Sequence, residues 1–358
     1  MTRSRQKRGQ HLIRGERAFS GRRLAWFALL FLGLSAAGIW AVYAQVAGHQ
    51  VQWDARLLSG QLVLASLALL LVYFIADGLR LWFTLRALGH SISLSAMARL
   101  VFLNIFISNI TPLATGGGAA QVWFLHRHGV PVGTGLTATT MRTALAMFFI
   151  FGAVPILLLA LPSAGDAVRS DSLVISLGVS VALYIGFFVV LITRSSWLLC
   201  PLLAMLKALR AVHLISPERH HRLRLWLARE LRRFAHGFGR YLRGRKLDIL
   251  GSFVFTAVFL LALFSFPALL LWALGYGIDY WVVIGRMLMT TFVMYFSPTP
   301  GASGIAEGVF GYFFRDVVSA SHLVLVTVAW RALTIYLGML IGLFVTQREI
   351  VASRRGAA

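Results

Sequence analysis

The chain alternates long apolar runs with short polar segments, and the runs are longer than the helices of an ordinary soluble core. A helix needs about 20 apolar residues to cross the hydrocarbon of a bilayer. Six runs reach this length: residues 24–47, 60–88, 134–161, 171–193, 249–274 and 321–346. The pattern therefore predicts an all-α, polytopic membrane protein with about six full transmembrane helices.

Two further apolar runs, 96–111 and 282–297, are shorter, and each ends in a cluster of proline and glycine. Proline removes a backbone donor and irregular backbone is not tolerated in contact with lipid, so neither cluster suits a lipid-facing span. Each cluster is followed by another apolar segment, 119–128 or 305–316. The pattern predicts two re-entrant hairpins, each made of a half-helix, a break and a returning half-helix.

Lysine and arginine gather in alternate polar segments of the chain. Eight of them lie within residues 1–23, thirteen within residues 194–248 and three within residues 348–358. The segments expected on the other side hold few, among them Arg56 and Arg169. Because cytoplasmic loops carry an excess of Lys and Arg, we expect both termini in the cytoplasm, and we expect the protein in an inner (plasma) membrane of bacterial type.

The expected organisation consists of two membrane halves around a basic loop. Its segments are a basic cytoplasmic N-terminus (1–23), a first membrane half (24–193) with a hairpin at about 96–128, a basic cytoplasmic loop (194–248), a second membrane half (249–347) with a hairpin at about 282–316, and a cytoplasmic tail (348–358). Within the loop, apolar residues recur at steps of three or four: Leu223, Leu227, Leu231, Phe234, Phe238 and Leu242. This stripe among arginines predicts an amphipathic helix on the anionic inner leaflet.

The two hairpin regions repeat one pattern of residues. The matching positions are Arg99, Pro112, Gln121 and Arg142 in the first region and Arg286, Pro298, Glu307 and Arg331 in the second. The proline precedes the Gln or Glu by nine residues in both, and the other spacings differ by one to three residues. The first hairpin would enter from inside and the second from outside, so the repeats would be inverted. Inverted repeats with broken helices indicate a transporter whose substrate site lies near the midplane.

Two arginines lie deep within predicted spans. Arg142 and Arg331 follow about eight and ten residues of their spans, which places them about 12–15 Å along the helix. An arginine at such depth costs at least about 2.5–3.5 kcal/mol on insertion scales. Both could face a polar cavity and bind an anionic head group, with two parallel hydrogen bonds if it is a phosphate. Either could also pair with Glu307 as a structural tie, and the two interpretations are compatible.

The helix breaks supply further candidate contacts for an anion. Half-helices that restart near Gly116 and Gly301 would direct free backbone N–H groups toward the midplane, which is a ready anion site. The alternative is that the glycines and prolines only permit the turn. The candidate contacts are Asn109, Thr111, Thr115, Gly116, Gly117 and Gln121 at the first break and Ser297, Thr299, Gly301, Ser303, Gly304 and Glu307 at the second, with Pro112, Pro298 and Pro300 as helix breakers.

Two acidic positions lie inside the apolar segments. Glu307 could pair with an arginine, cap its half-helix or carry a proton for coupled transport, and a capped or paired structural role is favoured. Asp77 and Arg80 are three residues apart near the inner end of the second span. Residues at this spacing share a helix face, which predicts a structural ion pair between them.

The composition excludes several other classes of protein. Hydrophobic residues make up 58% of the 358 residues and charged residues 13%, which is far from a soluble enzyme. The formal net charge of +22 falls in blocks between apolar runs, so it indicates membrane orientation and not nucleic-acid binding. The single cysteine, Cys200, and scattered histidines give no metal site, and no motif indicates a cofactor.

The residues of the two breaks resemble a known family. Asn109-Ile-Thr-Pro-Leu-Ala-Thr-Gly-Gly-Gly118 with Gln121 and Arg142, together with Pro298-Thr-Pro-Gly-Ala-Ser-Gly-Ile-Ala-Glu-Gly308, are similar to the transmembrane region of lysylphosphatidylglycerol synthases and their stand-alone relatives. The resemblance covers about residues 20–350. Ala302 departs from the pattern, because the family usually has another glycine there.

The resemblance implies a function in moving lipids. In full-length synthases this region is associated with moving aminoacylated lipid between leaflets, while a separate soluble domain makes that lipid. This chain reaches Ala358 without such a domain, so we expect a flippase-like lipid transporter and not an enzyme. The implied partners are membrane lipids of the anionic phospholipid or polyprenyl-phosphate type. The protein could form a homo-oligomer or act with a soluble enzyme. The alternative is an accessory protein or integral-membrane enzyme of lipid-linked sugar, isoprenoid-lipid or aminoacyl-phospholipid metabolism.

Overall fold

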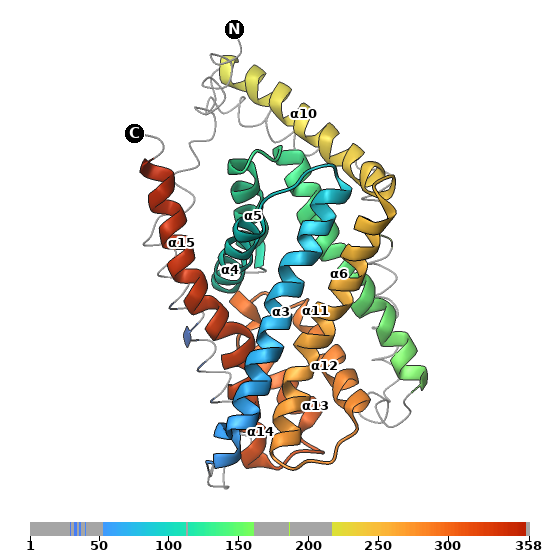
Figure 1. Cartoon of the computed structure of the whole chain (residues 1–358), viewed down its shortest axis with the longest axis vertical. Coiled ribbons are helices and arrows are strands. Elements are labelled where there is room, and N and C mark those ends of the chain that lie inside the picture. The colour runs from blue at the N-terminus through green and yellow to red at the C-terminus, as the bar shows by residue number, and fades with distance from the viewer. Residues whose placement is uncertain are drawn as a thin grey trace.

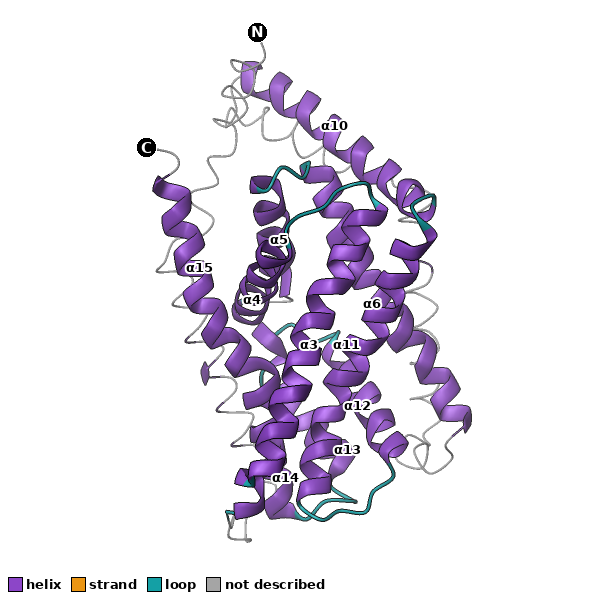
Figure 2. Cartoon of the chain, viewed as in Figure 1, coloured by secondary structure: helices purple, strands orange, loops and turns teal. Residues whose placement is uncertain are grey.

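The computed structural model describes residues 53–111, 114–160 and 217–355, together with a few isolated positions before and between them. Every regular element in these ranges is a helix, as Figure 2 shows. The expected spans 24–47 and 171–193 lie essentially outside the described residues. So do the whole of the expected cytoplasmic N-terminus, the first part of the basic loop and Pro112 of the first break.

The centre of the fold is an antiparallel pair of long helices. Helix α3 (Gly60–Ala87) and helix α11 (Lys246–Ala273) pack against each other along their lengths. The rings of Tyr73 and Phe259 stack midway with centroids 5.0 Å apart. At one end, Arg86 of α3 lies 3.2 Å from Asp248 of α11. The first hairpin packs against α3 and the second against α11.

Each half contains one short helical hairpin. The first consists of α4 (Leu94–Ile110) and α5 (Thr115–Arg127). The second consists of α12 (Tyr280–Met294), the 3-10 turn η4 (Pro300–Ala302) and α13 (Ile305–Phe314). Because α3 and α11 run in opposite directions, the hairpins that follow them enter the bundle from opposite ends, and η4 contacts α4 where they meet (Figure 1). The arrangement within the bundle is therefore inverted, as the sequence predicts.

Capping side chains fix where the hairpins begin. The Ser93 hydroxyl accepts a hydrogen bond from the Ala96 N–H at 3.3 Å and starts α4. Asp279 starts α12 by accepting from the Trp281 N–H at 2.8 Å. Such caps satisfy N–H groups that a helix leaves unpaired at its first turn. Two unrelated polar residues thus set equivalent points in the two halves.

The remaining helices enclose these elements. Helix α6 (Val132–Ala160) follows the first hairpin, and α14 (Ala320–Arg331), the π-helical turn η5 (Ala332–Tyr336) and α15 (Leu337–Arg355) follow the second. Four stretches of the described chain are helical, long and apolar enough to cross a membrane: Gly60–Ala87, Val132–Ala153, Lys246–Ala273 and Ala320–Ala352. They correspond to four of the six predicted spans.

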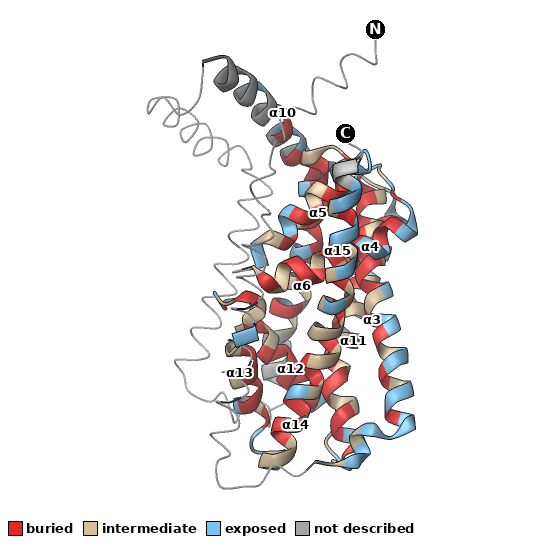
Figure 3. Cartoon of the chain, turned by 90° about the vertical axis from the view of Figure 1, so that its left-hand side faces the viewer, coloured by how far each residue is buried: buried red, intermediate tan, exposed pale blue. Residues whose placement is uncertain are grey.

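The burial of residues distinguishes the helix surfaces that pack on other helices from those that face outward. Figure 3 shows buried residues where helices meet and exposed residues along the outer side of α3. The exposed residues there are apolar, with Leu64 71% and Leu71 62% accessible. A soluble protein rarely exposes such a continuous apolar face. This surface is therefore that of a protein whose solvent is lipid.

Helix α10 (Pro217–Leu242) carries the predicted amphipathic stripe, and part of it packs on protein. Phe234 and Phe238 are 4% and 2% exposed, in a core shared with α6 and the first hairpin. Glu230 accepts a hydrogen bond from the Gly133 N–H at the start of α6, at 2.7 Å. The predicted amphipathic helix is present, and the part of its apolar stripe that holds Phe234 and Phe238 packs on protein, while its position on the inner leaflet stays a prediction.

Candidate functional site

One threonine connects the two helices at the first break by hydrogen bonds. Thr111 donates a hydrogen bond to the Ile107 carbonyl at 2.8 Å and accepts one from the Gly116 N–H at 3.1 Å, so it ties α4 to the start of α5. Ala114 between them has a left-handed backbone, with φ 52°. Thr115 is exposed at the first position of α5. The backbone N–H of Gly116 is thus already used within the protein, and the threonine supports the turn.

A polar cluster lies just behind this break. The Asn104 side-chain oxygen accepts hydrogen bonds from Ser108, at 3.1 Å, and from the Gln121 amide. A Cβ at Gly117 would lie 2.8 Å from that oxygen, so a glycine is required for the helices to approach this closely. The buried Gln121 side-chain oxygen has no hydrogen-bond partner in the described part of the chain. Asn109 lies apart, because its amide donates to the Ile105 carbonyl of its own helix at 2.8 Å.

The second break is a tighter turn that uses its own hydroxyl groups. Thr299 donates to the Ser303 carbonyl at 2.9 Å, and Ser303 donates to the Pro300 carbonyl at 2.7 Å. Ser297 lies 2.9 Å from the Thr299 hydroxyl. Three further residues have positive φ: Gly301 (56°), Ala302 (53°) and Gly304 (82°). The predicted hydroxyl contacts therefore stabilise the break itself.

Glu307 and Arg331 form an ion pair that joins α13, α14 and the second break. The Arg331 Nε and the Glu307 Oε1 are 2.9 Å apart, and both side chains are 0% exposed. The other Glu307 oxygen accepts from the Gly304 N–H at 2.7 Å, so the glutamate also caps α13. Arg331 donates to the Gly301 carbonyl at 3.1 Å. Its Nη1 is buried without a hydrogen-bond partner in the described residues, which leaves donor capacity unused.

Arg142 has a different partner from Arg331. Its guanidinium lies 2.5 Å from Oδ1 of Asp77 on α3. Arg80 contacts the same oxygen at 2.5 Å and rests on the Phe259 ring, 3.6 Å from its centroid. The structure thus contains the contact suggested by the i, i+3 spacing of Asp77 and Arg80. It adds Arg142, whose partner lies 65 residues away and could not be found from helical spacing.

The first arginine of each hairpin is also paired at the end of the bundle. Arg99 lies 2.5 Å from Glu349 of α15, and Arg286 lies 2.5 Å from Asp316 beyond α13. Hydrogen bonds from Arg286 lower the pKa of the Asp316 carboxyl. The comparison of the two halves of the sequence identified these arginines as matching positions, but it did not indicate which residues they pair with. They hold each hairpin to the helix or loop beside it.

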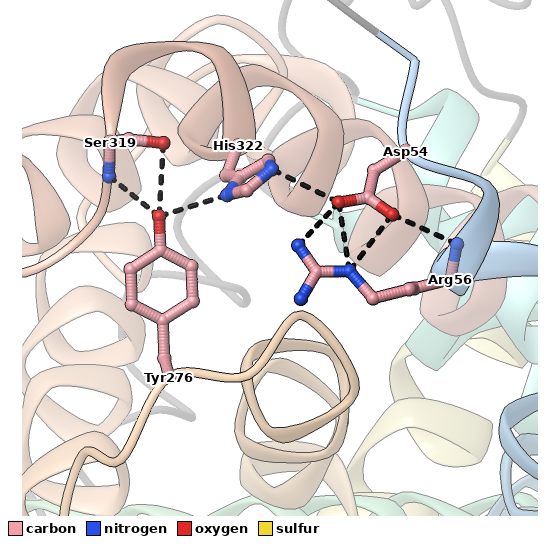
Figure 4. A network of polar contacts seen from close by, with 5 residues as sticks. All are labelled: Asp54, Arg56, Tyr276, Ser319 and His322. Atoms are coloured by element: carbon pink, nitrogen blue, oxygen red, sulfur yellow. Dashed lines mark hydrogen bonds and ion pairs between the residues drawn. The ribbon is translucent and has the colours of Figure 1, made fainter.

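A further network links three segments at the end of the bundle that carries the second hairpin (Figure 4). The Tyr276 hydroxyl donates to Ser319 at 2.9 Å and contacts the ring of His322 at 2.9 Å. The other ring nitrogen of His322 lies 3.3 Å from Asp54. Hydrogen bonds from Arg56 lower the pKa of Asp54 to about 2. The sequence gave no signal for this network, because its members are far apart in the chain.

The described residues offer an anion better contacts than they offer a metal. They contain no group of three or more His, Cys, Asp or Glu side chains placed to hold a metal ion. They contain instead buried guanidinium groups beside backbone breaks, and guanidinium groups recognise carboxylates and phosphates. The structure brings Glu307, Arg331, Gly301 and Gly304 together, and it brings Asp77, Arg80 and Arg142 together. Gln121 belongs to a third, uncharged cluster.

Long apolar helices, two inverted hairpins and buried ion pairs define a polytopic helical membrane protein. The family model of the lysylphosphatidylglycerol synthase TM region matches residues 25–342, and the chain belongs to that family. The resemblance found in the two breaks is thereby confirmed. The chain is also 24% identical over 322 residues to a UPF0104 membrane protein of Archaeoglobus fulgidus, across 90% of this chain and 97% of the relative.

Proposed function

We propose that this protein is a flippase-like lipid transporter of an inner membrane, which moves an amphiphile with an anionic, phosphate-bearing head group between leaflets without changing it chemically. The observation that carries the proposal is the meeting of two inverted hairpins beside buried arginines. Arg331 contacts the second break directly through Gly301. Arg142 lies on α6, which packs against α5 of the first hairpin and α12 of the second. Both arginines therefore lie on helices that pack against the broken hairpins.

The lengths of the hairpin helices support a re-entrant arrangement. Helix α4 has 17 residues and α12 has 15, so they measure about 26 Å and about 23 Å at 1.5 Å per residue. The hydrocarbon core is about 30 Å thick. Neither helix spans it, and a broken helix inside a membrane is tolerated where it lines a protein cavity. Counted from Arg99 and Arg286, which are ion-paired at the two ends of the bundle, the helices rise about 16 Å to Ile110 and about 12 Å to Met294. These rises are about half of the hydrocarbon thickness, so we infer that both breaks lie near the midplane.

The distribution of charge supports one orientation. The end of the bundle that carries α10 also holds Arg99, Arg127 and the end of α15 (Figure 1). The opposite end holds the Asp54 network and the Asp316–Arg286 pair, where acidic and basic groups balance. Positive charge is enriched on the cytoplasmic side of membrane proteins. We therefore place the α10 end, with the C-terminal end of α15, in the cytoplasm.

The ion pairs suggest how a head group would be exchanged. In the described arrangement Glu307 and Asp77 are the anions held by Arg331 and Arg142. A lipid phosphate presents the same kind of acceptor oxygen and can take their place when one repeat moves relative to the other. Arg142 keeps one buried nitrogen, Nε, without a hydrogen bond among the described residues, and Arg331 keeps Nη1 in addition to the Nε that faces Glu307. The unused donors allow a head group to bind before a carboxylate leaves.

Reconstitution of the purified protein tests this proposal. Liposomes with fluorescent phospholipid report how much inner-leaflet probe becomes accessible to an external reductant. We expect Arg142→Gln and Arg331→Gln each to slow exchange by at least about tenfold, because a charge-assisted hydrogen bond contributes about 1.5–3 kcal/mol. Arg99→Gln is the matched control, since it removes an arginine with an acidic partner outside the site. An exchange rate no higher than that of protein-free liposomes, with several anionic lipids, would exclude transport by this chain alone.

A double substitution separates head-group binding from a structural tie. Arg331→Leu with Glu307→Leu removes both charges, and replacing a buried pair by apolar residues is often nearly neutral for stability. We expect the double variant to fold as well as the wild type and to remain transport-deficient. Recovery of transport in the double variant would show that Arg331 serves only to neutralise Glu307.

A further inference from the structure

The cluster of Asp77, Arg80 and Arg142 contains one positive charge more than its carboxylate can balance. The exposed fractions of the three side chains are 3%, 7% and 10%. The hydrogen bonds that Asp77 accepts from both guanidinium groups go to one oxygen, Oδ1. Two cations and one anion thus share a site that is almost closed to solvent. The Glu307–Arg331 pair, by contrast, is balanced one to one.

The other carboxylates whose side chains the structure describes are each engaged elsewhere. The pairs are Asp54 with Arg56, Asp248 with Arg86, Glu230 with Arg233, Glu349 with Arg99, Asp316 with Arg286 and Glu307 with Arg331, and Asp279 caps α12. An uncompensated buried charge is strongly unfavourable. The Phe259 ring beneath Arg80 eases this cost but does not neutralise the charge. Among the described side chains, the cluster therefore has no second anion.

An unused donor shows where that anion would bind. The Arg142 Nε is buried, with no hydrogen-bond partner among the described residues, and the whole residue is 9% exposed. Arg142 lies on α6, which packs against α12 of the second hairpin. The two guanidinium groups of the cluster thus offer donors to one small anionic group beside that hairpin.

We propose that Arg80 and Arg142 bind a singly charged phosphodiester of a membrane lipid, which supplies a second negative charge beside Asp77. This assignment rests on the proposed function only in taking a membrane lipid as the ligand. A phosphodiester carries one negative charge and matches the surplus of one. A phosphomonoester with two charges would leave the cluster negative. The site therefore selects lipids such as phosphatidylglycerol over lipids that end in a monoester phosphate, and Arg80 is a head-group ligand as well as a partner of Asp77.

Thermal unfolding in a neutral detergent measures this binding without requiring transport. The probes are phosphatidylglycerol, phosphatidic acid and diacylglycerol with the same acyl chains, and dimethyl phosphate as a soluble phosphodiester. We expect phosphatidylglycerol to raise the unfolding temperature more than the others do. In Arg80→Gln and in Arg142→Gln the half-saturating mole fraction of phosphatidylglycerol should rise about tenfold. The control Arg99→Gln should keep the wild-type value. If the wild type and the three variants have the same half-saturating mole fraction of phosphatidylglycerol, the proposal is overturned. If dimethyl phosphate raises the unfolding temperature as much as phosphatidylglycerol does, the assignment of the ligand to a lipid is overturned.

The charge count itself can be changed. Asp77→Asn leaves two positive charges, so at about pH 8, above the second phosphate pKa near 6, preference should move toward phosphatidic acid. If Asp77→Asn does not fold, Arg80→Gln carries the same test, because a neutral pair should lose about tenfold of the preference for phosphatidylglycerol over diacylglycerol. If the lipid preference is the same in the wild type and in the variants with a changed charge, the site is refuted. Binding of phosphatidylglycerol without lipid exchange in liposomes would refute the proposed transport and leave the site standing. Lipid exchange without this binding would refute the site and leave the proposed transport standing.

Discussion

At the scale of single residues, backbone strain is concentrated where the helices break. Ala114 and Ala302 both have left-handed backbones, and they are the only non-glycine residues with positive φ in the described part of the chain. The left-handed conformation costs an L-residue about 1–2 kcal/mol, and glycine escapes this cost. Such strain persists only where the surroundings enforce it. Here the enforcing contacts are the hydroxyl bridges of Thr111 and Thr299.

Replacing Ala302 by glycine should relieve this strain. Glycine loses more entropy on folding, about 0.5–1 kcal/mol, so Ala302→Gly is expected to stabilise the protein by about 0.5–1 kcal/mol net. Unfolding temperature in detergent is the measurement. Ala306→Gly is the matched control, because Ala306 is helical and the same exchange should destabilise there. A destabilised Ala302→Gly protein would mean that the Ala302 methyl group makes a necessary contact.

Partners at this scale were partly predictable from the sequence. The pairing of Glu307 with Arg331 was one of two open interpretations, since both had visible counterparts in the repeat. The pairing of Arg142 with Asp77 was not predictable, because it depends on how α6 crosses α3. Helical spacing relates residues on one helix, and it contains no information about which faces of two helices meet. The surplus positive charge of the cluster of Asp77, Arg80 and Arg142 could not be predicted for the same reason.

At the scale of elements, the hairpins were predictable and the docking of α10 was not. Proline and glycine leave a clear mark on the sequence, so helix breaks can be found without a structure. An amphipathic stripe has an apolar face, but lipid and protein satisfy that face equally well. Only the structure shows that this part of α10 packs on protein, because Glu230 is hydrogen-bonded to the start of α6 and Phe234 and Phe238 are buried.

The docking of α10 on α6 can be broken at one glycine. A Cβ at Gly237 would lie 2.6 Å from the Cγ2 of Thr137 and 2.8 Å from its Cβ, which leaves no room for a side chain. Gly237→Val should therefore release α10, and limited proteolysis in detergent should cut within residues 217–242 several-fold faster. Gly239→Val is the control, because nothing lies within 4 Å of a Cβ at that position of the same helix. Equal cleavage rates for the two variants would argue against docking.

At the scale of the whole molecule, the Asp54 network connects the segment before α3, the α11–α12 connection and the start of α14 (Figure 4). The Asp54 pKa falls from 3.8 to about 2 because Arg56 donates hydrogen bonds to its carboxylate. A carboxyl with a lowered folded-state pKa stabilises the fold above its unfolded pKa, and the effect is lost as pH falls through the folded value.

The Asp54→Asn variant should therefore be less stable than the wild type at neutral pH. The difference between their unfolding temperatures should shrink as pH falls from about 4 to about 2, because the wild-type carboxylate becomes protonated over that interval. Asp279→Asn provides a comparison, since Asp279 caps α12 at the same end without touching the network. A constant difference across this pH range would exclude a contribution from the charge of Asp54.

The inverted arrangement makes a prediction about both sides of the membrane. If each hairpin is re-entrant, the two connections that flank it must lie on one side. Ser91 and His128 flank the first hairpin and Gly277 and Arg315 flank the second, and all four are exposed. In a chain with Cys200→Ser, single cysteines at Ser91 and His128 should react with a membrane-impermeant maleimide only from the cytoplasmic side. Cysteines at Gly277 and Arg315 should react only from the opposite side.

Labelling of the flanking connections does not by itself show that a hairpin is re-entrant. A hairpin that spanned the bilayer as two separate helices would still return its ends to one side, so the break must be probed as well. A cysteine at Thr115 should react slowly from either side compared with Ser91, because a position near the midplane is far from the water on both sides and the maleimide does not enter the membrane. Rapid labelling of Thr115 from the side opposite to Ser91 would place the first break at the far surface. The arginine clusters would then lie away from the midplane, and the alternating exposure proposed for a lipid head group would lose its structural basis.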